Sequence, residues 1–250
     1  MNGAMEQSAP PGGHYLRQGP PIWLPLLILI GLSAVFRFSQ LDLELEHWFW
    51  SPTDGWWLAN HPLVLFLYHY GVWPALIVGV GGGLFWIAPR LKRLAWQRPP
   101  ALGVFLALLL LLGPGMVING IFKEHFSRSR PVQICEFGGN QPYRPLGERG
   151  PQDGGKSFPS GHAAMGFYWL GLFVYFKDHR RTLAWGFATL GLLHGLLMGL
   201  GRMAQGGHWP SDILWSAGFV YLIAWVLNYL LARNRSTFSA RSGLTPSPAT

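Results

Sequence analysis

The sequence predicts an all-α integral membrane protein with six transmembrane helices, and two observations predict this class. First, 50% of the 250 residues are hydrophobic and 15% are aromatic, whereas only 12% are Asp, Glu, Lys or Arg. A soluble domain carries roughly 25% charged residues, so the composition excludes a disordered chain and a water-soluble monomer. Second, long uncharged stretches separate the charges, and a helix that crosses a membrane needs about 20 mostly apolar residues.

Six stretches meet or approach this requirement. They cover residues 22–36, 62–88, 101–122, the interval between Lys156 and Lys177, the interval between Arg181 and Arg202, and the interval between Asp212 and Arg233. The first stretch is short, and we expect the side chain of Arg37 at its end to extend towards the interface. The chain thus divides into a tail, 1–21, a six-span domain, 22–233, and a second tail, 234–250. We expect both tails to be disordered, because they are polar and rich in Gly, Pro, Ser or Thr.

The distribution of Lys and Arg predicts the orientation, because cytoplasmic loops carry an excess of these residues. With both tails in the cytoplasm, 11 of the 19 Lys and Arg residues lie inside, and the first outside loop, about 40–61, has four acids and no Lys or Arg. Within this loop, residues 41–50 could form an interfacial helix or a short extended segment. The second outside loop, 123–159, breaks the rule with six cations: Lys123, Arg128, Arg130, Arg144, Arg149 and Lys156.

Three polar clusters interrupt the apolar pattern, and six alternating spans would place all of them on the outer face. They are residues 123–131, 157–162 and 201–212. In the second cluster, Pro159-Ser160-Gly161 precedes an apolar run, which predicts a helix that begins with Ser160 near its N-cap. The free N–H groups and partial positive charge of a helix N-terminus suit a phosphate. His162 would lie in the first turn of that helix, beside the bound anion.

The third cluster places His208 before the last span and Asp212 just inside it. A carboxylate near an imidazole can accept the Nδ1 proton and leave Nε2 as a nucleophile or a base. Lys123, Arg130 and Arg202 supply the positive charge that a phosphoryl group needs in its transition state.

These clusters resemble the three-part signature of the type 2 phosphatidic-acid phosphatase superfamily. The matching residues are Lys123-x6-Arg130-Pro131, Pro159-Ser160-Gly161-His162 and Arg202-x5-His208-x3-Asp212. That superfamily includes membrane lipid phosphatases, bacterial acid phosphatases and vanadium haloperoxidases. The resemblance extends from about the third span to the sixth. One departure is Gly201, where the family commonly has Ser.

The resemblance implies a role for each matching residue. His208 would form a phosphohistidine, Asp212 would orient it, and His162 would protonate the departing lipid oxygen and then activate water. The phosphoryl oxygens would be held by Lys123, Arg130, Arg202, Ser160 and the Gly161 N–H. The resemblance implies neither a metal nor another cofactor.

The resulting hypothesis is a phosphatase of the inner membrane that removes a terminal phosphate from a phospholipid, a polyprenyl diphosphate or a lipid A-type substrate. The site would lie at the extracytoplasmic ends of the third to sixth helices, and no nucleic acid would be a partner. A phosphotransferase using the same phosphohistidine is a close alternative. A haloperoxidase and a non-enzymatic lipid-binding or transport protein are more distant ones. Loop 132–156 is long and polar, so we expect it to lie over the site and to read the substrate headgroup.

Other residues have simpler interpretations. A metal site at His162, His208 and Asp212 is disfavoured, because the neighbouring cations would repel a divalent ion. We expect Arg128 to lie on a solvated face or to anchor lipid headgroups. His69 and His194 are expected to be neutral and hydrogen-bonded between helices, and Cys135 to be unpaired. The glycines in 81–83 and 195–201 should allow close helix packing.

Overall fold

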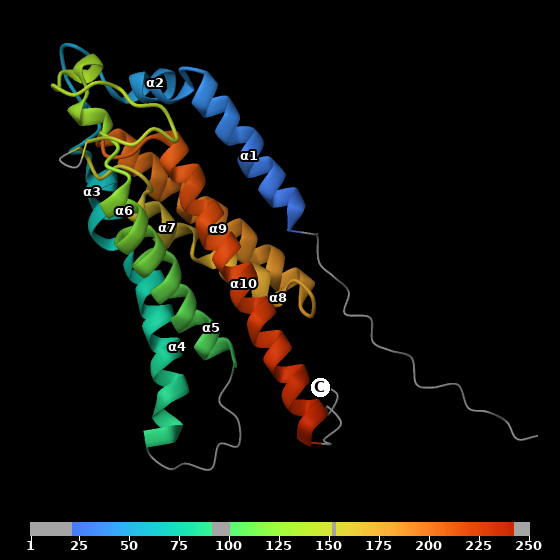
Figure 1. The fold of residues 1–250 in the computed structure, drawn as a ribbon. Coiled ribbons are helices and arrows are strands. Elements are labelled where there is room, and N and C mark those ends of the chain that lie inside the picture. The colour runs from blue at the N-terminus through green and yellow to red at the C-terminus, as the bar shows by residue number, and fades with distance from the viewer. Residues whose placement is uncertain (1–21, 92–100, 152–153, 243–250) are drawn as a thin grey trace, which may run out of the picture.

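The computed structural model describes residues 22–91, 101–151 and 154–242, and in these ranges the chain is helical with no strand beyond isolated bridges (Figure 1). The all-α class is therefore confirmed. The expected disordered tail 1–21 and the loop 92–100 lie outside the described residues.

Four helical segments of the described chain are long and apolar enough to cross a membrane. They are Pro62–Ala88, Ala101–His125, Arg181–Ala204 and Pro210–Ala232. The first comprises α3 (Pro62–Tyr70) and most of α4 (Trp73–Leu91), and the second comprises α5 (Ala101–Leu110), the π-helical segment η2 (Leu111–Phe122) and the short α6 (Lys123–His125). The other two are α9 (Arg181–Ala204) and the first part of α10 (Pro210–Ser242). These four agree with four of the six expected stretches.

The other two stretches leave the count of six spans unconfirmed. Helix α1 (Trp23–Phe38) has 16 residues and bends by 85° into the segment Leu41–Phe49, so it gives a fifth span only if this bent pair counts as one. The stretch between Lys156 and Lys177 forms α7 (Gly161–Phe167) and α8 (Trp169–Phe176). Residues 161–176 would span about 24 Å at 1.5 Å per residue, less than the roughly 30 Å hydrocarbon core. The uncharged stretch is longer than the helical segment, because its residues 157–160 form a buried loop before α7.

The last helix is longer than the sequence predicted. The sixth apolar span ends at Ala232, next to the expected Arg233. The helix α10 itself continues to Ser242, into the segment 234–250 that we expected to be disordered. The physical reason is visible in the sequence, because no glycine or proline interrupts the chain between Gly218 and Gly243. Residues 243–250 lie outside the described ranges.

The core of the bundle forms around α7 and α8. Phe105 and Leu109 of α5 pack with Tyr168 and Trp169, and the cluster continues to Leu227 of α10. Small residues set the helix spacing as expected: a Cβ on Gly166 of α7 would lie 2.7 Å from the Cα of Gly195 of α9. His194 of α9 accepts a hydrogen bond from the indole of Trp169 at 3.0 Å, which agrees with the interhelical bond expected for it.

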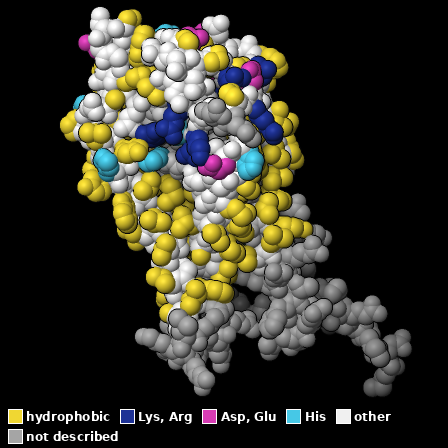
Figure 2. Space-filling view, turned by 60° about the vertical axis from the view of Figure 1, so that its left-hand side comes forward, with side chains coloured by type: hydrophobic (Ala, Val, Ile, Leu, Met, Phe, Trp, Pro, Cys, Tyr) yellow, Lys and Arg dark blue, Asp and Glu magenta, His cyan; other side chains and the backbone are white. Residues whose placement is uncertain are grey.

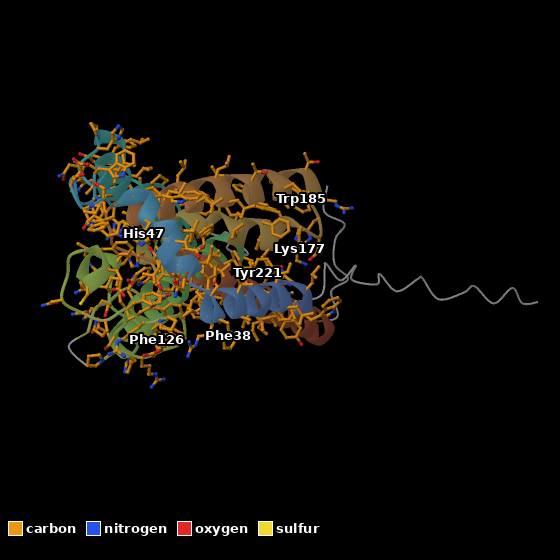
Figure 3. All side chains as sticks on the ribbon, turned by 90° about the horizontal axis from the view of Figure 1, so that it is seen from above. Phe38, His47, Phe126, Lys177, Trp185 and Tyr221 are labelled. Atoms are coloured by element: carbon orange, nitrogen blue, oxygen red, sulfur yellow. The ribbon has the colours of Figure 1, made fainter. Side chains whose placement is uncertain are left out.

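One end of the bundle carries the irregular part of the chain. Helix α2 (Leu41–Glu46), the following 3₁₀ turn and residues 123–151 and 154–160 lie together at this end (Figure 1). Residues 41–46 are helical, which settles the alternative that the sequence left open. Figure 3 shows His47 and Phe126 towards this end, whereas Lys177 and Trp185 lie towards the other. The three polar clusters therefore meet at one end of the bundle.

Candidate functional site

The first polar cluster leaves the bundle at Lys123 and turns sharply at Ser127. Ser127 has φ 47°, a left-handed conformation that is uncommon for residues other than glycine. Gly150 packs directly against the Ser127 backbone, where a Cβ would collide with it. After this turn, the side chain of Arg128 is fully buried, whereas Arg130 is half-buried. After the turn, Arg128 therefore lies in the protein interior, whereas Arg130 lies partly at the surface.

The second cluster caps α7 as the sequence predicted. The Ser160 hydroxyl accepts a hydrogen bond from the Ala163 N–H at 3.3 Å, and the Ser160 N–H donates to the Ser216 hydroxyl at 3.0 Å. Gly161 follows at the first helical position and lies against Asn119 of η2, with only 2.8 Å between a hypothetical Cβ and Oδ1. Asn119 donates to the Pro114 carbonyl at 2.6 Å, and its Oδ1 accepts from Lys123 Nζ at 3.5 Å. Asn119 thus links Lys123 to the start of α7.

His208 lies in the link between α9 and α10, and its side chain is almost completely buried. Its Nδ1 lies 2.6 Å from the Ser157 carbonyl oxygen. Because a carbonyl can only accept, Nδ1 must carry the proton, and the neutral ring then has its lone pair on Nε2. Burial lowers the pKa of His208 to about 4 despite the opposing charge of Asp212, and Arg202 and Lys123 lower this pKa further. His208 is therefore neutral at pH 7.

The structure places Asp212 beside His208 but gives it other hydrogen-bond donors. Its Oδ2 lies 3.7 Å from Nδ1 of His208, beyond hydrogen-bond length. The same oxygen accepts from the Trp209 N–H at 2.9 Å and from the Ser157 hydroxyl. Ser157 thus contacts Asp212 with its hydroxyl and His208 with its carbonyl. The structure thus adds Ser157 as a link between Asp212 and His208.

Arg128 does not lie on a solvated face, so that prediction was wrong. Its Nη1 donates to Asp212 Oδ1 at 2.7 Å and its Nη2 donates to Asp42 Oδ2 at 2.7 Å, and all three side chains are fully buried. Asp42 of α2 also accepts from the Ser211 N–H at 3.0 Å. The guanidinium lies 5.3 Å from the ring centroid of Trp209. Two carboxylates compensate the buried charge of Arg128, which makes it a structural cation.

Three other cations have no such compensation. Within the described ranges, Lys123, Arg130 and Arg202 have no carboxylate oxygen within 4 Å. All three interact electrostatically with His162, and two of them, Lys123 and Arg202, also do so with His208. Figure 2 shows Lys, Arg and His side chains gathered at this end of the molecule, above a largely hydrophobic surface. Unpaired cations held close together favour a multiply charged anion.

His162 lies in the first turn of α7, as the sequence predicted. Its imidazole stacks on the ring of Tyr68 from α3, with centroids 4.8 Å apart and planes 10° apart. Arg202 lies over the same tyrosine, with its Cζ 4.9 Å from the ring centroid, and donates to Gln205. Five of the predicted site residues lie at or just before the N-terminal ends of α7 and α10: Ser160, Gly161, His162, His208 and Asp212. The other three are the cations Lys123, Arg130 and Arg202, whose charges act on His162.

Sequence reasoning missed several residues of this site. Asp42, Ser157 and Arg128 form its buried network, whereas Tyr68 and Asn119 support His162 and Lys123. A signal was present for two of them. Asp42 is an acid within an apolar–acidic alternation, and Asn119 is a lone amide in an uncharged stretch, where a polar side chain requires a partner.

The loop after Arg130 packs on the α9–α10 link. The Val132 N–H donates to the Gly206 carbonyl at 3.0 Å, and Tyr143 meets Trp209 edge-on with centroids 5.1 Å apart. Among the described residues, no group of three or more His, Cys, Asp or Glu side chains could hold a metal ion. The cluster combines a neutral imidazole, a second imidazole and three unpaired cations, a set suited to nucleophilic attack on an anionic phosphorus centre.

The fold defines a helical membrane protein, and the site combines two histidines with three unpaired cations at one end of the bundle. The family model described as PAP2 superfamily matches residues 101–236. This is more than half of the chain, and the protein therefore belongs to the PAP2 superfamily. The matched range contains all eight predicted site residues but excludes Asp42 and Tyr68.

Three curated relatives share part of the sequence, and each is named lipid A 4'-phosphatase. The protein from Francisella tularensis subsp. novicida (strain U112) is 39% identical over 132 residues, which are 52% of this chain and 59% of that protein. The one from Rhizobium leguminosarum is 31% identical over 119 residues, 46% of this chain and 49% of the relative. For Rhizobium etli (strain ATCC 51251) the identity is 33% over 119 residues, with 46% and 45% covered. The chain thus spans about half to three-fifths of the length of these relatives. No solved structure matches.

Proposed function

We propose that this protein is a membrane phosphatase that removes a phosphate group from a lipid A-type glycolipid. The observation that carries the proposal is the state of His208: a buried, neutral imidazole with its proton on Nδ1 and its Nε2 free, beside unpaired cations. A neutral nucleophile can approach an anionic phosphate without repulsion, and fixed cations stabilise the charge of the transition state.

In the first step, Nε2 of His208 attacks the phosphorus and the bond to the lipid oxygen breaks. The departing oxygen takes a proton from His162, which returns to the neutral form. In the protein alone, burial and the charges of Arg202 and Lys123 lower the pKa of His162 to about 4. His162 therefore acts as an acid only once the bound phosphate, whose negative charge raises this pKa, has entered the site. Lys123, Arg130 and Arg202 hold the phosphoryl oxygens together with the N–H of Gly161 and the hydroxyl of Ser160. Asp212 stabilises the positive charge that His208 acquires, at 3.7 Å from Nδ1.

In the second step, water attacks the phosphohistidine and the nitrogen–phosphorus bond breaks. His162 accepts a proton from this water, and inorganic phosphate leaves with His208 restored. Because no residue of this scheme needs a metal or another cofactor, we propose a metal-independent hydrolase. A phosphotransferase would differ only in that a second lipid phosphate replaces water.

The substrate class rests on the relatives and on the site's position. All three relatives carry the name lipid A 4'-phosphatase. The predicted site residues lie at one end of long apolar helices, and we propose that this end meets the lipid headgroups and the aqueous phase. Val132 and Tyr143 of loop 132–156 contact the α9–α10 link, which supports the proposed role of this loop in recognising a large headgroup. We further propose six membrane crossings in the inner membrane, with both termini in the cytoplasm and the site facing outward.

The test is release of inorganic phosphate by the purified protein in detergent, without an acceptor lipid. The substrates are a lipid A-type glycolipid phosphate, phosphatidic acid and a polyprenyl diphosphate, and we expect the glycolipid to react fastest. His208→Ala should lower the rate by about 10⁴-fold or more. His179→Ala, an exposed histidine next to Lys177 at the other end of the bundle, is the matched control.

Each outcome separates a different hypothesis. Phosphate release by His208→Ala at the wild-type rate would refute the role of His208 as the nucleophile. An equal loss of rate in the control His179→Ala would refute it as well. Phosphate transfer to added lipid with no release in its absence would establish the transferase instead. A protein that binds the lipid without turnover, in the wild type and in His208→Ala alike, would be a lipid-binding protein.

A further inference from the structure

Tyr68 lies against the candidate acid–base residue although it belongs to a different part of the chain. It is in α3, and the family model that matches begins only at residue 101. Its ring is nearly parallel to the imidazole of His162, with a 10° interplanar angle and 4.8 Å between centroids. A second contact joins the same ring to the guanidinium of Arg202 at 4.9 Å. Tyr68 therefore connects two of the groups expected to act on the phosphate.

The packing of α3 holds this ring in place. His61 caps the helix by accepting from the Leu63 N–H at 3.3 Å, and Pro62 occupies the first turn. At the other end of α3, Gly71 lies so close to Met198 of α9 that a Cβ would collide with its sulfur. The crevice between Tyr68, His162 and Arg202 leaves no space for a water molecule. The face of the ring towards His162 and Arg202 is thus closely packed, although the side chain of Tyr68 is 38% exposed overall.

The imidazole needs such support because its own helix provides little. His162 is half-buried, and a residue in the first turn of a helix has no preceding turn to restrict its rotamer. The parallel contact fixes the plane of the imidazole. A hydrogen bond to the Tyr68 backbone engages the same imidazole and helps to determine which edge of the ring faces the site. The cation over the tyrosine ring adds attraction through the ring's negative face. The stacking and the cation contact both use the tyrosine ring, and neither uses the phenolic hydroxyl.

We propose that Tyr68 is a positioning residue that holds the imidazole of His162 in the orientation needed for proton transfer. The inference rests on the proposed function, because it assigns His162 to acid–base chemistry. It adds α3 to the parts of the chain that build the site. It also separates the aromatic ring, which is required, from the hydroxyl, which is not.

The experiment measures phosphate release at saturating substrate for variants of Tyr68. Tyr68→Leu should lower kcat by about 100-fold, the effect expected for a catalytic group misplaced by about 1 Å. Tyr68→Phe should retain kcat within about twofold, because the stacked ring is preserved. Tyr70→Leu, on the same helix with its ring against Phe66, is the matched control and should behave as the wild type.

The decisive comparison uses His162→Ala as the background. If Tyr68 acts through His162, adding Tyr68→Leu to His162→Ala should cost less than about threefold, because coupled residues are not additive. The same 100-fold loss in both backgrounds would overturn the proposal, and so would a Tyr68→Leu variant with wild-type kcat. Equal thermal unfolding temperatures for Tyr68→Leu and Tyr68→Phe would show that the difference in rate is not a folding defect. If His208→Ala keeps its activity, the proposed function fails instead, whatever the Tyr68 variants do.

Discussion

Replacing Arg128 tests whether its buried network holds the site together. Arg128→Met keeps much of the side-chain volume but leaves Asp42 and Asp212 buried without their shared cation. The guanidinium makes bonds of 2.7 Å to each carboxylate, and no part of the three side chains is exposed. Removing one partner of a buried ion pair costs about 3–5 kcal/mol, because an uncompensated charge remains in the interior. On the scale of soluble domains this corresponds to a fall in Tm of roughly 10 °C.

The assay is thermal unfolding of the purified protein in detergent, followed by circular dichroism. Arg128→Lys should be intermediate, because an ammonium cannot make the forked contacts that reach two carboxylates at once. Lys156→Met is the matched control, since it breaks the exposed pair between Lys156 and Glu124 and should leave Tm almost unchanged. Phosphate release by Arg128→Met should also fall, because Asp212 and Ser157 lose their fixed positions.

A solvated or lipid-anchoring Arg128 would give a different result. In that case Arg128→Met and Lys156→Met would have the same Tm as the wild type, to within about 2 °C. That outcome would refute the buried network, and with it the link between α2 and the site.

Three further predictions concern pH, helix packing and metals. The pKa of His208 in the folded protein is about 4, below that of an exposed histidine. As pH falls from about 6.5 to 4, the unfolded chain therefore binds a proton that the folded protein does not, and the stability present above this window is lost. The Tm of the wild type should fall more steeply across this window than the Tm of His208→Gln. Gly161→Ala should destabilise the protein by about 1–3 kcal/mol, because the new Cβ would lie 2.8 Å from the side-chain oxygen of Asn119. Adding Asn119→Ala to this variant should restore part of the lost Tm, and no recovery would contradict the contact. Phosphate release should persist in excess EDTA, and a loss that added divalent metal reverses would overturn the metal-independent mechanism.

Much of the fold follows from local sequence, because each segment that crosses the lipid must by itself be apolar and helical. Every backbone group of a membrane-crossing segment must be satisfied internally, so an uncharged stretch such as 101–122 predicts a helix without reference to its neighbours. The prediction is less secure where protein replaces lipid as the surroundings. Helices α7 and α8 are short and contribute to the buried core of the bundle. The bend after Phe38 precedes α2, whose Asp42 accepts a hydrogen bond from the Ser211 N–H of α10.

The candidate site shows the same division. The cap at Ser160 and the positions of His162 and His208 follow from a few adjacent residues, which is why the sequence predicts them. Arg128 is two residues from Arg130, and their composition and spacing do not distinguish a buried cation from one that faces a substrate. The distinction depends on Asp42, which is 86 residues away along the chain.

By itself, the sequence determined the class of protein, the apolar helices and the three clusters of polar residues. Only the tertiary structure decided which cations are compensated and which remain unpaired. It also decided that Ser157 lies between Asp212 and His208, and that Tyr68 lies against His162. The physical reason is that hydropathy and helix capping act over a few neighbouring residues, whereas the state of a charge or an imidazole is set by groups that folding brings from distant segments.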